Sequence, residues 1–140
     1  AMDLTRILLS ITLFFTSIAF VSCSEDETTA PPTSTAVTSK FSDIKAKVFV
    51  NCTDAQCHSS AGSSGGLVLE SGVAFNNLVG VQSALFPTSK RVEVGNSANS
   101  ILIKILKGDV SPQMPLNRTP LPAATIDSIA KWIDNGALNN

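Results

Sequence analysis

The sequence has few residues of the types that usually carry chemistry. Its 140 residues include no tyrosine, one tryptophan, one histidine, three cysteines and two methionines. Lysine and arginine total 10 against 11 aspartates and glutamates, which gives a formal net charge of -1. Nucleic acids require a basic protein surface, so we expect no nucleic-acid partner. The scarcity of donor side chains also leaves few candidates for each chemical role.

The longest apolar run extends from Ile7 to Val21 and directly follows Arg6. It is shorter than the roughly 20 residues that a membrane-spanning helix needs. A run of this length behind a basic residue is typical of the apolar core of a secretory signal peptide. The alternative is a short membrane anchor that is not cleaved. We predict a signal peptide over residues 1–23 and export to the periplasm or the cell surface.

The apolar run ends in Phe20-Val21-Ser22-Cys23, which resembles the lipobox of bacterial lipoproteins. In that family the cysteine is acylated, so the resemblance implies lipidation at Cys23 and a membrane anchor. The alternative is an unpaired thiol. Residues 24–39 follow, rich in threonine, serine and proline, with an acidic start and almost nothing to bury, which predicts a flexible tether. The globular domain is then expected over residues 40–140.

Apolar residues in the globular region recur at helical spacing, and no convincing strand pairs appear. We therefore predict an all-α domain. Four helices are expected, and serine, glycine and proline mark their ends. They are a helix from Ser39 or Ser42 to about Cys52, a short helix from Ser71 to Val79, a helix from Ser97 or Ser100 to Gly108, and a last helix from Pro122 to Gly136.

The segment Cys52-Thr53-Asp54-Ala55-Gln56-Cys57-His58 brings two cysteines together with the only histidine. A cysteine pair whose second member precedes a histidine is the signature of covalent c-type haem attachment. In such a motif the cysteines form thioether bonds and the histidine binds iron. A disulfide between Cys52 and Cys57 is an alternative, because exported proteins meet oxidising conditions. A zinc site is a weaker alternative, because structural zinc needs four ligands.

Met114 is the only methionine after the predicted signal peptide, and it lies in Ser111-Pro112-Gln113-Met114-Pro115. The prolines on both sides restrict the backbone and would limit the orientations of the thioether. A methionine in a proline-framed loop is the usual sixth iron ligand of small cytochromes. The alternative is an ordinary methionine in a surface loop.

From Ser39 to Leu138 the chain resembles the bacterial monohaem cytochrome c family, including domains fused to larger exported proteins. Several landmarks of that family occur in the same order. They are the Cys52–His58 motif, Gly65-Gly66-Leu67, Val94-Gly95-Asn96-Ser97, Met114-Pro115 and Trp132-Ile133-Asp134-Asn135-Gly136-Ala137. Two features depart from the family: four residues separate the cysteines, and Ser59 stands where glycine usually follows the histidine.

The resemblance implies a small cytochrome c fold, with four to five short helices wrapped around one haem. The first and last helices of that fold cross, and the matching positions here are Val48 or Phe49 against Trp132 or Ile133. The resemblance also implies one covalent haem c on Cys52 and Cys57, with His58 and Met114 as axial iron ligands. Packing on the haem would come from Leu67, Phe75 and Leu102.

An electron carrier that exchanges electrons with redox partner proteins is the function that this resemblance implies. Two axial ligands leave no open iron position for a substrate, so we expect no enzymatic activity. A haem peroxidase would also need a distal group, and His58 is the only histidine. The remaining alternative is a haem-free exported lipoprotein module with a Cys52–Cys57 disulfide.

Overall fold

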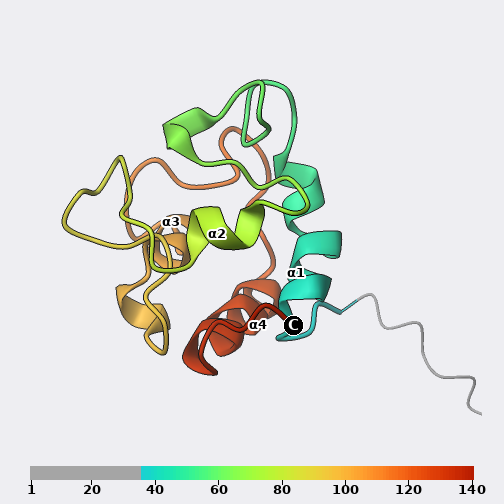
Figure 1. The fold of residues 1–140 in the computed structure, drawn as a ribbon, viewed down its shortest axis with the longest axis vertical. Coiled ribbons are helices and arrows are strands. Elements are labelled where there is room, and N and C mark those ends of the chain that lie inside the picture. Colours follow the sequence, from blue (N-terminus) through green and yellow to red (C-terminus); the bar gives the residue numbers. More distant parts are fainter. Residues whose placement is uncertain (1–35) are drawn as a thin grey trace, which may run out of the picture. The chain divides into compact units, whose positions relative to one another are not determined.

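The computed structural model describes residues 36–140. The predicted signal peptide, the lipidation site Cys23 and most of the predicted tether lie outside the described residues. Four α-helices are present in the described part of the chain (Figure 1). They are α1 (Phe41–Lys47), α2 (Ala74–Leu78), α3 (Ile101–Lys107) and α4 (Ala123–Asp134).

Three short 3-10 turns complete the helical structure: η2 (Phe49–Cys52), η3 (Ser64–Gly66) and η4 (Ser97–Asn99). Extended pairing within residues 36–140 is limited to isolated bridges, such as the one between Val79 and Val92. The described domain is therefore helical, which confirms the predicted all-α class. None of its helices is long and apolar enough to cross a bilayer.

The start of α1 differs from the prediction, because neither Ser39 nor Ser42 caps it. Lys40 occupies the N-cap position and provides no side-chain hydrogen bond. Asn140 satisfies the first helical N–H groups instead: its Oδ1 accepts from the Phe41 N–H at 3.0 Å, and its main-chain oxygen accepts from the Ser42 N–H at 2.8 Å. Figure 1 shows the C-terminus beside the first turn of α1. A cap from the far end of the chain satisfies donors that a local serine would otherwise serve.

The prediction of a single first helix reaching Cys52 is wrong in detail. Regular α-helix ends at Lys47, and the chain tightens into η2 after Val48. The third helix ends and the last helix begins as predicted, and α4 ends at Asp134, just before the expected Gly136. Gly108 follows α3 with a left-handed φ of 82°, and α4 begins after Pro122. Proline is compatible with the start of a helix, and glycine readily adopts the left-handed conformation that ends one. These residues therefore predict helix ends from local sequence.

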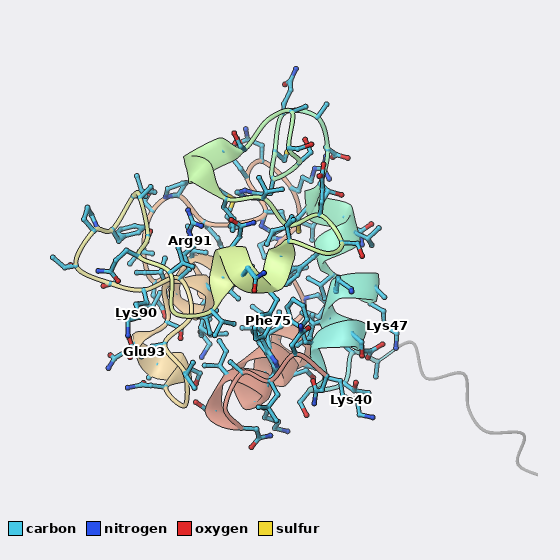
Figure 2. The ribbon with its side chains drawn as sticks, viewed as in Figure 1. Lys40, Lys47, Phe75, Lys90, Arg91 and Glu93 are labelled. Atoms are coloured by element: carbon cyan, nitrogen blue, oxygen red, sulfur yellow. The ribbon has the colours of Figure 1, made fainter. Side chains whose placement is uncertain are left out.

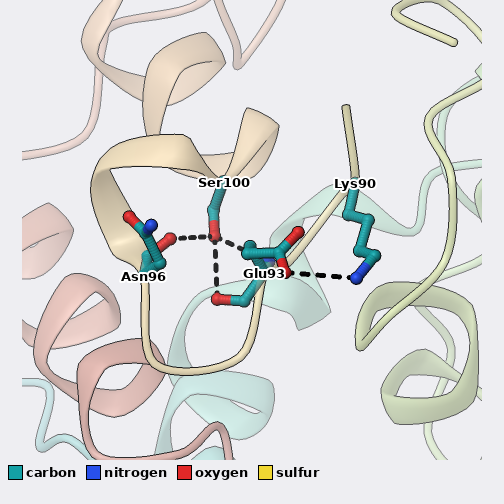
Figure 3. Close-up of polar contacts among 4 residues, drawn as sticks. All are labelled: Lys90, Glu93, Asn96 and Ser100. Atoms are coloured by element: carbon teal, nitrogen blue, oxygen red, sulfur yellow. Dashed lines mark hydrogen bonds and ion pairs between the residues drawn. The ribbon is translucent and has the colours of Figure 1, made fainter. Parts of the chain in front are cut away.

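Ser100 precedes α3, but its hydroxyl does not cap that helix. The fully buried hydroxyl accepts a hydrogen bond from the Glu93 N–H at 2.8 Å and donates to the Asn96 carbonyl at 2.9 Å (Figure 3). In the same turn, the Lys90 ammonium lies 3.1 Å from a Glu93 carboxylate oxygen. Ser100 therefore fixes the turn that leads into α3, which forms one wall of the site described below.

An aromatic cluster joins α1, α2 and α4. The ring of Phe41 lies 5.2 Å from Trp132, 5.3 Å from Phe75 and 6.2 Å from Phe49, measured between centroids. Figure 2 shows Phe75 between α2 and α4. The Phe41–Trp132 contact joins α1 to α4. Val48 and Phe49, the positions expected from the family, are buried in the same core cluster as Trp132 and Ile133. Tilted and edge-on rings of this kind stabilise a core beyond simple burial.

The last residues of the predicted tether already belong to the folded domain. Val37 packs against the core, and the Lys47 ammonium donates to the Ala36 carbonyl at 2.9 Å. The Thr38 N–H donates to an Asp43 carboxylate oxygen at 2.6 Å, and this bond, together with Lys47, lowers the pKa of Asp43 below its usual value. The boundary placed after residue 39 is therefore too late, because an apolar side chain and two polar contacts order residues 36–39.

Candidate functional site

A cavity of about 360 Å³ lies beside α3 and the segment that contains η2. Its size falls in the range of roughly 300–1,000 Å³ that is usual for ligand and cofactor sites. Apolar side chains form most of its wall. Those from the core side include Val48, Phe49, Leu69, Leu78, Ile105 and Leu106.

Four of the predicted site residues line this one cavity: Cys52, Cys57, His58 and Met114. Cys52 ends η2, Cys57 and His58 follow in a series of turns, and Met114 belongs to the loop after α3. The fold therefore brings the methionine to the two cysteines and the histidine across a long stretch of sequence.

The predicted packing residues are divided between two places. Leu67 and Leu102 are part of the cavity wall. Phe75 is not among the lining residues, and its ring packs against Phe41 in the aromatic cluster. The sequence pattern predicts that the Phe75 side chain is partly buried. The orientation of α2 then places its ring against Phe41 and not on the cavity.

The imidazole of His58 is held in one tautomer. Its Nδ1 lies 3.2 Å from the Leu67 carbonyl oxygen. Because a carbonyl only accepts hydrogen bonds, Nδ1 must carry the proton, and the Nε2 lone pair is left available to bind a metal. The backbone of His58 is fixed on both sides as well: its N–H donates to the Cys52 carbonyl at 3.0 Å, and its carbonyl accepts from the Leu69 N–H at 2.7 Å.

Both cysteines of the motif are free thiols in the structure, and both are partly buried. The Cys52 Sγ lies 3.5 Å from the Val48 carbonyl oxygen. Burial raises the pKa of Cys52 above its usual value, and the nearby Cys57 raises it further. Cys52 is therefore a protonated thiol at neutral pH, as expected where an apolar wall disfavours the thiolate.

Met114 is positioned by the end of α3. Its N–H donates to the Ile105 carbonyl at 3.0 Å, and the side chain packs against the core. The carbonyls of the last helical turn have no partners within a helix, so this contact satisfies one of them. Gly108 ends α3 and lets the chain turn back, which brings the proline-framed loop against the helix it has just left.

The loop that follows the cysteine motif packs directly on it, and sequence reasoning did not single this out. Ser64 donates from its N–H to the Cys57 carbonyl at 2.9 Å and from its hydroxyl to the Gln56 carbonyl at 3.1 Å. A Cβ atom at Gly62 would lie 2.7 Å from the Ala55 carbonyl oxygen and 2.8 Å from the Cys57 carbonyl oxygen. The glycine- and serine-rich composition of the loop was the available signal.

We expect Gly62→Ala to destabilise the domain by about 1–3 kcal/mol, because rigid backbone atoms must move to admit the methyl group. Denaturant unfolding of the same preparation measures the difference. Ser60→Ala is the matched control in this loop, since it removes only an exposed hydroxyl contact to Glu70 and should change stability by no more than roughly 0.5 kcal/mol. Equal midpoints for the two variants would contradict the close approach at Gly62.

Two arginines also line the cavity, although nothing in the sequence pattern placed them there. Arg118 forms an ion pair with Asp54 of the cysteine motif and donates to the Asn51 carbonyl at 3.4 Å. The Asp54 carboxylate raises the pKa of Arg118 above its usual value. Within residues 36–140 the side chain of Arg91 instead donates only to main-chain carbonyls, as described below.

A comparison with models of known protein families, with curated proteins and with solved structures finds no match. Across residues 36–140, no group of three or more histidine, cysteine, aspartate or glutamate side chains is placed to hold a bare metal ion. The chemistry of the cavity must therefore be inferred from the residues that line it.

Proposed function

We propose that the cavity binds one covalently attached haem c and that the protein carries single electrons. The observation that supports this most directly is the convergence of Cys52, Cys57, His58 and Met114 on one apolar cavity. The cysteine–histidine motif predicted the first three of these residues, and the proline-framed loop separately predicted Met114. Neither sequence feature alone requires the four side chains to line the same cavity.

The donor set fits haem. Cys52 and Cys57 would hold the group through thioether bonds, and His58 Nε2 would be one axial ligand of the iron. The His58 Nδ1–H bond to the Leu67 carbonyl matches the outer contact that metal-bound histidines usually make. Met114 would be the second axial ligand. When bound, the haem would supply reversible one-electron chemistry.

The other residues of the site would control the surroundings of that reaction. The apolar wall keeps water away from the two ligands and lowers the local dielectric. Histidine and methionine together favour a raised reduction potential and leave no iron position for a substrate. The helix order, the Phe41–Trp132 contact between α1 and α4, and the position of the methionine loop support a small cytochrome c fold.

Production of the full chain with haem-attachment machinery tests the proposal. We expect colour that survives denaturation and acid-acetone extraction, and a band that stains for haem peroxidase activity on a denaturing gel. Complete extraction of the haem would contradict covalent attachment. A colourless protein without titratable thiols at Cys52 and Cys57 would indicate the disulfide-linked module instead.

We further propose that the protein is exported, anchored to a membrane through a lipid on Cys23, and oxidised and reduced by partner proteins. Cys23→Ser should then release the domain into the soluble fraction, because the tether offers no other apolar hold and stable anchoring depends on acyl chains. Membrane fractionation followed by haem staining measures the release. Retention of the variant would point to an uncleaved anchor formed by Ile7 to Val21.

A further inference from the structure

Arg91 connects several segments that are distant in the sequence. Its Nη1 donates to the Asn77 carbonyl at 2.8 Å, and its Nη2 donates to the Gly65 and Gly66 carbonyls at 3.1 and 2.9 Å. Figure 2 shows the side chain on the inner side of its segment, close to α2. The main-chain carbonyl of Arg91 also accepts from the Leu102 N–H at 2.9 Å. One residue thus joins η3, the end of α2 and the start of α3.

The backbone conformation of Gly65 and Gly66 turns both of their carbonyls toward the Arg91 guanidinium. Gly65 and Gly66 have φ values of 62° and 64°, both left-handed. In an extended chain successive carbonyls point to opposite sides, whereas in a helical conformation of either hand they point the same way. Consecutive left-handed residues are accessible mainly to glycine. This conformation lets both carbonyls accept hydrogen bonds from one nitrogen of Arg91.

The next residue is the one that holds His58. Leu67 directly follows Gly66, and its carbonyl accepts the His58 Nδ1–H. Two residues later, the Leu69 N–H donates to the His58 carbonyl. The segment fixed by Arg91 at one end is therefore the same segment that grips the ring and the main chain of His58.

We propose that Arg91 is the positioning residue for His58: by clamping the Gly65 and Gly66 carbonyls it holds the Leu67 carbonyl against Nδ1 and so directs Nε2 into the cavity. This inference rests on the proposed role of His58 as an iron ligand. It assigns to Arg91 a function in setting the orientation of that ligand, and through it the reduction potential.

The charge of Arg91 is a second property that the test must separate from its geometry. Its side-chain contacts within the described residues are all neutral carbonyls, and burial lowers its pKa from the usual value. A guanidinium keeps its charge in proteins. Arg118, on the same cavity, is paired with Asp54 and bonds to Asn51, and neither of these contacts involves the Gly65–Leu67 segment. The two arginines therefore form a matched pair.

The experiment compares Arg91→Lys, Arg91→Gln and Arg118→Gln in the full chain made with haem-attachment machinery. Three quantities are measured: exchange of the His58 Nδ1–H with solvent by NMR, the reduction potential, and the electron paramagnetic resonance spectrum of the oxidised protein. Lysine keeps the charge but has one nitrogen, which cannot hold three carbonyls in a fixed fork. Exchange of the Ile133 amide in α4 reports global unfolding and is measured in parallel.

We expect the His58 Nδ1–H to exchange at least roughly tenfold faster in both Arg91 variants than in the wild type. A factor of this size corresponds to the loss of one hydrogen bond from a charged group, here the Arg91 guanidinium. Both should also shift the potential and the axial-ligand signature of the spectrum, whereas Arg118→Gln should leave the exchange rate unchanged. An equal acceleration at Ile133 would reduce Arg91 to a stabilising residue and overturn the inference. A potential shift in Arg91→Gln alone would also overturn it, because charge would then be the cause.

Failure of the haem proposal gives a different result. A wild-type protein without covalent haem would disprove the proposed function, while exchange of the His58 Nδ1–H in the folded chain would still report whether Arg91 holds the Leu67 carbonyl. Conversely, a haem-loaded wild type with unaltered exchange in both Arg91 variants would disprove the positioning role and leave the proposed function standing.

Discussion

Met114→Ala should lower the reduction potential of the haem-loaded protein and open one axial position of the iron. The thioether of Met114 lines the same cavity as His58 and needs no deprotonation to bind a metal. Lysines would first have to lose a proton from a group with an ordinary pKa near 10.4. Loss of the thioether should shift the potential by on the order of 100 mV, within the ~0.8 V over which axial ligands set haem potentials.

Voltammetry and absorption spectroscopy measure this change. The sulfur-to-iron charge-transfer band of the oxidised form should disappear, and carbon monoxide should bind the reduced form. Leu116→Ala is the matched control, because Leu116 lines the cavity two residues further along the same loop and has no donor atom. A Met114→Ala protein with the spectrum and potential of the wild type would make Met114 an ordinary loop residue.

The double variant Cys52→Ser, Cys57→Ser should lose all covalent haem. Each single variant keeps one thiol on the cavity and should retain haem through one thioether bond, in lower yield. The hydroxyl that replaces the thiol keeps the size of the side chain but lacks the sulfur that the thioether requires. Acid-acetone extraction followed by absorption of the protein and solvent fractions distinguishes the three variants.

Cys23→Ser provides the control for this series, because it removes the third cysteine of the chain and should keep its haem in full. Colour that remains with the protein after extraction of the double variant would exclude thioether attachment at the motif. Full extraction from either single variant would show that both bonds are needed for attachment.

The features of the site that local sequence could predict are those set by neighbouring residues. The cysteine–histidine motif, the exit of α3 at Gly108 and the start of α4 after Pro122 all depend on short-range geometry. The cavity positions of Leu67 and Leu102 were also predictable, because Leu67 directly follows Gly65-Gly66 and Leu102 lies at the start of α3. The apolar spacing was also sufficient for the all-α class, because it reflects the period of each helix separately.

Long-range contacts decide the rest. Asn140 replaces the expected serine cap of α1, and Phe41 contacts Trp132 of α4 although its local sequence does not mark it for that contact. Phe75 lies in that aromatic cluster because of how α2 is oriented. The Arg91 side chain donates hydrogen bonds to main-chain carbonyls. Because every residue has such a carbonyl, no residue type in the sequence identifies the partners of Arg91. These positions are fixed only when the whole chain has folded.

The contact between Asn140 and the first turn of α1 brings the segment after α4 next to the start of α1. Ends that adjoin can be linked without distorting a fold, and new ends are tolerated best in exposed loops. A circular permutant with a short linker from Asn140 to Ala36, opened between the exposed residues Pro87 and Thr88, would keep every helix and every residue that lines the cavity. Such a permutant would have its helices in a different order along the chain but the same arrangement of helices in space.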